Sequence, residues 1–121
     1  MCQCHEHGSR FPLIQPCLLL LLYEKPTHGY ELIEKLMELG FDQCLDATTV
    51  YRNLRRMEEE GLVTSQWNTQ GPGPARRLYQ LTPEGEDLLH SWASAIRRKK
   101  ETLEKFLNKY NQHFPPKGGE V

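Results

Sequence analysis

The chain has 121 residues, of which 38% are hydrophobic and 26% are charged, and its formal net charge is −1. That length suits one globular domain with a modest core. Because the net charge is near zero, bulk charge does not indicate a nucleic-acid partner, and such a partner has to be argued from where basic residues gather. The longest apolar run extends from Cys17 to Tyr23. A membrane-spanning helix needs about 20 apolar residues, so this run is far too short to cross a membrane. We therefore expect a cytoplasmic protein with no membrane partner.

Residues 1–12 are predicted to form a flexible arm, since they have no apolar periodicity. The arm carries thiols and imidazoles, the ligand types that suit Zn²⁺ or Cu⁺, at Cys2, Cys4, His5 and His7. The Cys-x-Cys spacing is tighter than that of most structural zinc sites, and Cys17 or Cys44 can complete a site only if the arm folds back. A metal site and an arm that binds metal only incidentally both remain open. No other cofactor is expected.

Two helices are predicted in the segment that follows the arm. The first has Pro16 in its first turn, ends near Glu24 and is apolar nearly all round, which fits the centre of a small helical core. The second restarts after Pro26 with Thr27 or His28 as its cap and ends at a glycine, Gly40. Its predicted apolar face consists of Tyr30, Ile33, Leu36 and Met37.

The third predicted helix spans Ala47 to Val63, with Asp46 as its cap, and carries arginines in its front half and glutamates behind them. This order is the reverse of what the helix macrodipole favours. On a helical wheel, three apolar residues face the core: Val50, Leu54 and Met57. The outward face is polar and basic and consists of Thr48, Thr49, Arg52, Arg55 and Arg56, flanked by Tyr51 and Asn53.

Such a face suits the major groove of DNA. An arginine can bond two acceptors of guanine, and hydroxyl groups can bond phosphates and fix the register. A helix that enters DNA by its front half keeps its later glutamates away from phosphate. The alternative is a solvated helix in which Arg52 and Arg55 pair with Glu59, at about 0.2–0.5 kcal/mol per pair.

A β-hairpin is predicted from two alternating runs, residues 63–67 and 77–81, on either side of a glycine- and proline-rich turn. Arg76 and Arg77 lie just past this turn, where a wing would touch a flanking DNA backbone or minor groove. Ordinary exposed arginines are the alternative interpretation.

The last predicted helix begins at Pro83 and is roughly 40 Å long, longer than the small core can cover. An uncovered apolar stripe at near-heptad spacing favours a second copy of the chain as its partner. The stripe is formed by Leu88, Leu89, Trp92, Ile96, Leu103, Phe106, Leu107 and Tyr110. The predicted fold is mainly α with a small β hairpin: a winged helix-turn-helix over residues 13–82, a dimerisation helix over residues 83–113 and a loose tail over residues 114–121.

Three segments resemble the PadR family of bacterial transcriptional regulators: "LLLLLYEKPTHGYELIEKL", "TVYRNLRRMEEEGLV" and "GPARRLYQLTPEGEDLL". The resemblance covers about Leu13 to Leu89. It implies a homodimeric repressor that binds double-stranded DNA at a roughly two-fold-symmetric operator and is released by a small-molecule effector or another signal. It also implies that Tyr51 and its neighbours contact DNA. Trp92 falls where some members line a ligand pocket between subunits, although simple dimer packing is the alternative.

Two features depart from the family pattern. The chain has Thr48-Thr49 where many members have Gly-Thr, and "TVYRNL" is also similar to the recognition helix of Fur-type metal regulators, although no second, His-rich domain follows. The Cys/His arm is the other departure.

Three functions therefore stand as hypotheses: a dimeric DNA-binding repressor, a metal-responsive DNA-binding regulator that uses the arm, and a winged-helix module that binds only proteins. An enzyme is not expected, because the sequence has no phosphate-binding loop and no strong pairing of a nucleophile with a base, and His28, His90 and His113 are scattered along it.

Overall fold

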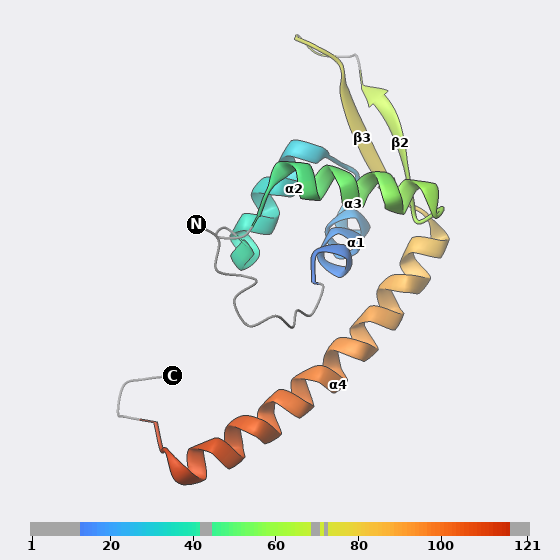
Figure 1. The fold of residues 1–121 in the computed structure, drawn as a ribbon. Coiled ribbons are helices and arrows are strands. Elements are labelled where there is room, and N and C mark those ends of the chain that lie inside the picture. Colours follow the sequence, from blue (N-terminus) through green and yellow to red (C-terminus); the bar gives the residue numbers. More distant parts are fainter. Residues whose placement is uncertain (1–12, 42–44, 69–70, 72, 117–121) are drawn as a thin grey trace. The chain divides into compact units, whose positions relative to one another are not determined.

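The computed structural model describes residues 13–41, 45–68, 71 and 73–116. The elements in chain order are α1 (Ile14–Glu24), β1 (Thr27–His28), α2 (Gly29–Leu36), η1 (Met37–Phe41), α3 (Ala47–Glu59), β2 (Val63–Asn68), β3 (Arg76–Leu81) and α4 (Pro83–His113). Figure 1 labels α1 to α4 and the hairpin strands β2 and β3. The chain forms two compact units, Met1–Leu89 and His90–Val121, which are described separately. No helix in the described ranges is both long enough and apolar enough to cross a membrane.

The core of the first unit lies where α1, α2, α3 and the base of the hairpin meet. The predicted inward face of α3 is confirmed, because Val50, Leu54 and Met57 are all fully buried. The other buried apolar side chains are Leu18, Leu19, Leu22, Leu32, Leu36, Leu62, Val63 and Tyr79. The first helix is buried on one side only, since α2, α3 and β3 pack against that side and leave Leu20 46% and Tyr23 57% exposed.

The second helix buries only part of the predicted face, because Leu36 is buried and Ile33 is half-buried but Tyr30 and Met37 are exposed. Gly29, Leu32 and Leu36 are buried, whereas Tyr30 is 42% and Met37 is 47% exposed. Tyr30 instead contacts the hairpin, and Met37 falls in the π-helical turn η1. The buried face is thus rotated toward Leu32, and a helical period alone cannot fix this rotation, because neighbouring faces of the helix both offer apolar residues at the right spacing.

The predicted caps of the second and third helices are confirmed by their local geometry, but the predicted end of the third helix at Val63 is wrong, because α3 ends at Glu59 and Val63 begins β2. His28 is the N-cap of α2 and forms a capping box with Glu31. Asp46 caps α3 by accepting a hydrogen bond of 3.2 Å from the backbone N–H of Thr48. Gly40 has a φ of 109° where the second helix ends.

The predicted hairpin is confirmed and gains a third strand. The antiparallel sheet has the order β1-β3-β2. The register pairs Val63 with Leu81, Ser65 with Tyr79 and Trp67 with Arg77, so these six side chains share one face. The two residues of β1 pair with Tyr79 and Leu78 and join the start of α2 to the sheet.

The first turn of α4 is fixed within the first unit. The Thr82 hydroxyl donates to the Gly61 carbonyl (2.7 Å) and accepts from the Gly85 backbone N–H (3.0 Å), so that Thr82 caps the helix. Gly85 is buried, and a Cβ at this position would collide with the backbone carbonyl of Leu62. Three helices and a β-hairpin in this order form a winged helix-turn-helix.

The second unit consists of the rest of α4 and the residues that follow it. The predicted long helix is confirmed, and its later turns expose large apolar side chains: Leu103 53%, Phe106 63%, Leu107 52% and Tyr110 47%. The rings of Phe106 and Tyr110 stack with centroids 6.2 Å apart, and those of Tyr110 and Phe114 lie 5.0 Å apart.

Candidate nucleic-acid interface

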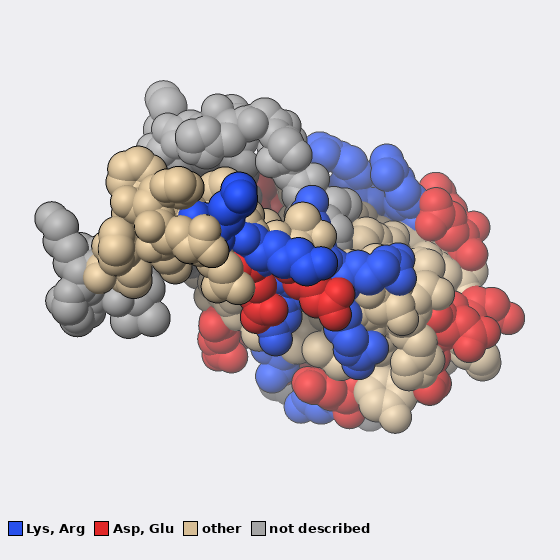
Figure 2. Space-filling view, turned by 90° about the horizontal axis from the view of Figure 1, so that it is seen from below, with Lys and Arg blue, Asp and Glu red and all other residues tan. Residues whose placement is uncertain are grey.

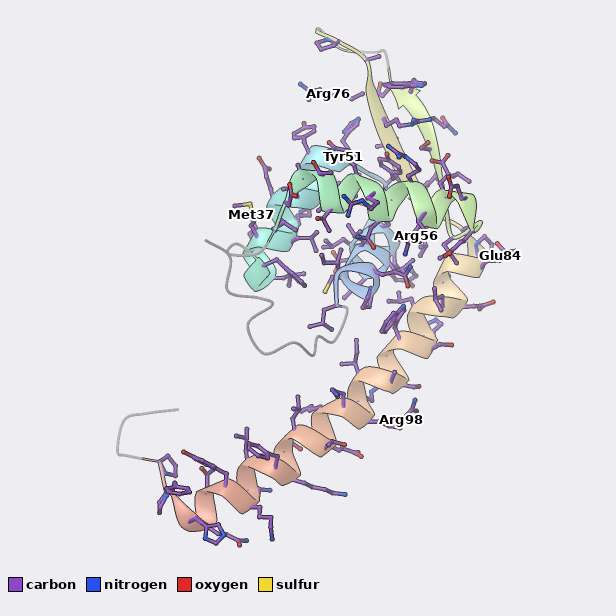
Figure 3. The ribbon with its side chains drawn as sticks, viewed as in Figure 1. Met37, Tyr51, Arg56, Arg76, Glu84 and Arg98 are labelled. Carbon is purple, nitrogen blue, oxygen red and sulfur yellow. The ribbon has the colours of Figure 1, made fainter. Side chains whose placement is uncertain are left out.

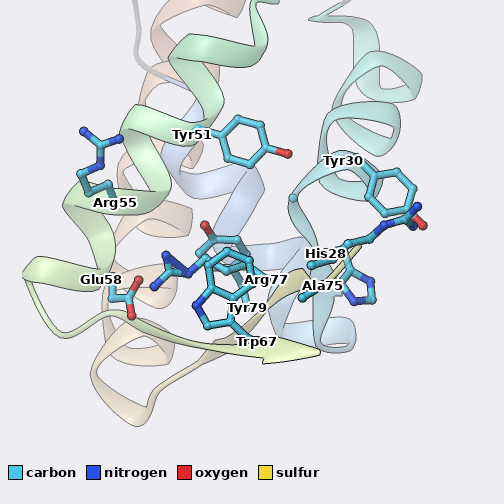
Figure 4. A pocket seen from close by; sticks show the side chains of 11 residues that line it. His28, Tyr30, Tyr51, Arg55, Glu58, Trp67, Ala75, Arg77 and Tyr79 are labelled. Atoms are coloured by element: carbon cyan, nitrogen blue, oxygen red, sulfur yellow. The ribbon is translucent and has the colours of Figure 1, made fainter. Parts of the chain in front are cut away.

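A groove of about 620 Å³ lies between the start of α2, the middle of α3 and the hairpin (Figure 4). From α3 it is lined by Tyr51, Arg55 and Glu58, whose spacing places them on one side of the helix. The remaining lining residues come from α2, its cap and the sheet: His28, Gly29, Tyr30, Trp67, Ala75, Arg76, Arg77 and Tyr79. The groove therefore combines three guanidinium groups with several aromatic rings.

Tyr51 reaches across this groove toward the start of α2 (Figure 4). Its ring lies so close to Gly29 that a Cβ added there would be 2.5 Å from Cε1 and 2.9 Å from the hydroxyl oxygen of the tyrosine. The side chain remains 40% exposed. Its hydroxyl is thus held at the groove wall by the glycine backbone and can donate a hydrogen bond to an incoming acceptor.

Arg77 is held by two contacts on the hairpin face that points toward α3. Its guanidinium carbon lies 4.9 Å from the centroid of the Trp67 ring, its cross-strand neighbour. Its Nε donates a hydrogen bond of 3.1 Å to the hydroxyl oxygen of Ser65. That hydroxyl in turn lies 3.0 Å and 2.9 Å from the two carboxylate oxygens of Glu58 on α3.

Arg76, the preceding residue of β3, lines the same groove and joins the hairpin to α2. Its guanidinium carbon lies 4.7 Å from the centroid of the Tyr30 ring, and that ring stacks on His28 at 6.0 Å. The Asn68 amide nitrogen lies 3.3 Å from Nε2 of His28. Figure 3 shows Tyr51 and Arg76 on the same side of α3.

Tyr79 forms part of the groove floor and is only 5% exposed. Burial raises the pKa of its hydroxyl above 10.0, and the charge of Glu58 adds to this, while Arg77 and Arg55 partly oppose it. The tyrosine therefore remains neutral at physiological pH. It adds no negative charge that would offset the positive charges of Arg77 and Arg55.

The predicted DNA-contacting residues divide into two groups. Tyr51, Arg55, Arg76 and Arg77 come together in the groove. The others lie on α3 outside its lining: Thr48, Arg52 and Arg56 are exposed, and Thr49 and Asn53 are half-buried. The Asn53 amide donates to the backbone carbonyl of Thr49 (2.9 Å), so it is engaged within its own helix.

The alternative of a solvated, ion-paired helix finds no support in the described residues, where no ion pair joins Arg52 or Arg55 to Glu59. Figure 2 shows acidic and basic side chains next to one another on the face that it draws. The arginines of α3 are therefore available to a ligand, although the chain as a whole is nearly neutral.

Several groove residues were not predicted from the sequence: His28, Tyr30, Glu58 and Trp67. Ser65, which lies outside the groove lining but bonds to Glu58, was not predicted either. The position of Trp67 could have been found, because the strand pattern places it opposite Arg77. Tyr30 carried no such signal, since its partner Arg76 is distant in sequence.

The predicted metal-binding residues Cys2, Cys4, His5 and His7 lie outside the described residues, as does Cys44. In the part of the chain that the structure describes, no three potential ligands gather around a common point. Cys17 is half-buried on α1, and burial raises the pKa of its thiol above 9.0, which disfavours the thiolate that a metal would need. Metal binding by the arm stays a prediction.

The groove and the exposed front of α3 define a winged-helix protein with a basic, hydroxyl-bearing face. Comparison with known proteins names the family. Residues 18–91 match the model of the transcriptional regulator PadR-like family. The chain belongs to this family, and the resemblance stated from its sequence motifs is confirmed.

Known relatives agree with this assignment. The negative transcriptional regulator PadR of Bacillus subtilis (strain 168) is 27% identical over 81 residues, which are 66% of this chain and 44% of that protein. The chain thus matches less than half the length of that curated relative. A PadR family transcription regulator structure from Clostridium difficile has a TM-score of 0.70 and 32% identity, covering 78% of this chain and 98% of that one.

A third comparison involves a complex. The structure of Bacillus subtilis PadR with operator DNA has a TM-score of 0.62 and 26% identity, and it covers 70% of this chain and 48% of that one. The winged helix-turn-helix fold with a long C-terminal helix is therefore confirmed as the fold of this chain.

Proposed function

We propose that this chain is a transcriptional regulator that binds double-stranded DNA through α3 and the hairpin. The observation that carries the proposal is the convergence of Tyr51, Arg55 and Arg77 in one groove between these two elements. In a helix-turn-helix, the front of the recognition helix reaches base edges in the major groove. The wing then meets the DNA backbone beside it, and the groove between helix and wing receives that backbone.

The side chains divide naturally between these two tasks. Thr48 and Arg52 are exposed at the front of α3, where a guanidinium can make two hydrogen bonds to guanine. Tyr51, Arg55 and Arg77 line the groove, where hydroxyl and guanidinium groups suit phosphate oxygens. The operator-bound relative supports this proposal, since its printed description is that of PadR in complex with operator DNA.

We also propose that the functional unit is a homodimer joined through α4. The later turns of this helix expose an apolar row, Leu103, Phe106, Leu107 and Tyr110. Contiguous exposed apolar surface of this kind marks an interaction site, and a two-fold dimer would present two recognition helices to a roughly two-fold-symmetric operator. Leu88, Leu89, Trp92 and Ile96 are half-buried on the same helix and would extend this interface. Trp92 would either pack there or contact an effector.

As a regulator of this family, the protein would act as a repressor, and a small molecule or another signal would release it. The proposal is tested by titrating labelled duplex DNA with the purified protein at several salt concentrations. We expect binding that weakens steeply as salt rises, because phosphate contacts release counterions. A protein-interaction module would bind no duplex at any salt concentration, and that result would reject the proposal.

A further inference from the structure

The acidic residue in the groove needs an explanation. Glu58 lines the same groove as Arg55 and Arg77, although a carboxylate repels phosphate. If it served only to neutralise an arginine, the two groups would form an ion pair. No such pair within 4.0 Å is present among the described residues; instead, Ser65 lies between Glu58 and Arg77.

The chain of hydrogen bonds has a defined direction. The Ser65 hydroxyl carries one proton, which it gives to a carboxylate oxygen of Glu58 at 2.9–3.0 Å. Its lone pair is then oriented to accept from Nε of Arg77 at 3.1 Å. Because a carboxylate is a strong acceptor, it fixes the hydroxyl rotor and with it the direction of the guanidinium.

The terminal nitrogens of the Arg77 guanidinium form no hydrogen bond with the described residues. Among the described residues, Nε makes the hydrogen bond of this guanidinium, and its carbon Cζ lies 4.9 Å from the Trp67 ring centroid. The two terminal nitrogens can still form an end-on fork with phosphate. An arginine held at Nε and on its face loses less rotamer entropy when it binds.

We infer that Glu58 and Ser65 are positioning residues that hold the Arg77 guanidinium ready for a backbone phosphate of bound DNA. This inference rests on the proposed function. The Glu58 carboxylate acts through Ser65 and does not contact DNA. What the site requires of residue 58 is therefore an oxygen that accepts the Ser65 hydrogen bond, and not a negative charge.

The test compares two substitutions that remove the same charge. Glu58→Gln keeps an acceptor oxygen for Ser65, whereas Glu58→Ala removes it. Glutamine and alanine are both good helix formers, so neither substitution should disturb α3. The probe is a duplex recovered by selection with the wild-type protein. We expect Glu58→Gln to bind at least as tightly as wild type, and Glu58→Ala to bind about two- to tenfold more weakly than Glu58→Gln. Equal or tighter binding by Glu58→Ala would overturn the inference.

A second comparison isolates the link to Arg77. Ser65→Ala should weaken binding about two- to tenfold in the wild type but leave it unchanged when Arg77 is already alanine. Ser65→Thr should restore binding because it keeps the hydroxyl. Thr64→Ala, an exposed neighbour on the opposite face of β2, is the matched control. An equal loss in both Arg77 backgrounds, or a failure of Ser65→Thr to bind better than Ser65→Ala, would also overturn the inference.

The salt dependence separates this inference from the proposed function. Arg77→Ala should lower the slope of binding against salt by about one phosphate contact. If wild-type protein binds no duplex, the proposed function fails. If it binds normally and Arg77→Ala leaves both affinity and slope unchanged, only the positioning role fails.

Discussion

The ring of Tyr51 lies against the backbone of Gly29, and a Cβ at residue 29 would be 2.5 Å from Cε1 of that ring. The glycine at the start of α2 therefore sets the position of a side chain on α3. This relationship links the HGYEL motif to the "TVYRNL" motif, which are separate in sequence but adjacent in the groove.

Gly29→Ala should displace the Tyr51 ring and weaken DNA binding, because the added methyl group occupies its place. Tyr51→Phe, which keeps the ring but removes the hydroxyl, should weaken binding about tenfold through loss of a hydrogen bond to phosphate. Titration of labelled duplex measures both effects. In a Tyr51→Ala background, Gly29→Ala should cause no further loss of binding. A full additional loss there would show that the glycine acts by another route.

Arg52 and Arg76 should affect binding in different ways. Arg52→Ala, on the exposed front of α3, should reduce the preference for the best site by about 1–3 kcal/mol. Arg76→Ala, on the hairpin, should weaken binding evenly across sequences and lower the salt slope by about 1. Competition between matched and mismatched duplexes at several salt concentrations distinguishes the two patterns. If both variants lost specificity alike, the separation of base and backbone contacts would be wrong.

The exposed apolar side chains on the later turns of α4 predict a dimer that a charged substitution in this row would disrupt. Phe106 is 63% exposed, and Phe106→Glu should give a monomer in sedimentation velocity because it places a charge in an apolar interface. Lys105→Glu is the matched control, since it also adds negative charge but at a neighbouring exposed position outside the apolar row. A Phe106→Glu protein that remained dimeric would place the interface elsewhere.

Gly85→Ala should destabilise the protein, although alanine normally favours a helix over glycine by about 1 kcal/mol. The added Cβ would collide with the Leu62 carbonyl, which joins the start of α4 to the base of the hairpin. We expect a loss of about 1–3 kcal/mol in the free energy of unfolding, measured with urea. Gly71→Ala has open space around its Cβ and should leave stability nearly unchanged. A stabilised Gly85→Ala protein would contradict this packing.

Tyr79 predicts a change of stability at alkaline pH. Burial raises the pKa of its hydroxyl above the ordinary value of 10.0, so the folded state holds the proton more tightly than the unfolded state. The stabilising contribution is fully present below pH 10 and is lost as the pH rises through the raised pKa. Urea midpoints measured across this range should fall more steeply for wild type than for Tyr79→Phe. Parallel curves would mean that this hydroxyl is not shielded.

Much of the fold follows from local sequence signals. The inward face of α3 combines a strong apolar period with a capping aspartate, and Val50, Leu54 and Met57 are buried as predicted. The hairpin follows from alternating residues around a glycine- and proline-rich turn. Each of these signals involves residues that are close together in the chain, so they can be recognised from a single sequence.

The features that the sequence did not predict depend on contacts between distant segments. The strand β1 has only two residues and no alternation of its own, so it is defined solely by its pairing with β3. Tyr30 was assigned to the core face of α2 because its spacing fits, but Arg76 of the hairpin covers it instead. The groove could be predicted only in part, since Glu58 and Ser65 acquire their roles from each other and from Arg77.

The most direct test of the central claim is selection of binding sites from a random pool of duplex DNA with the purified full chain, with and without a chelator. The account predicts enrichment of a roughly two-fold-symmetric site, and loss of that enrichment in the Tyr51→Phe, Arg77→Ala double variant. Enrichment that changed with the chelator would support the metal-responsive hypothesis for the Cys/His arm. A wild-type protein that enriched no sequence in either condition would contradict the account.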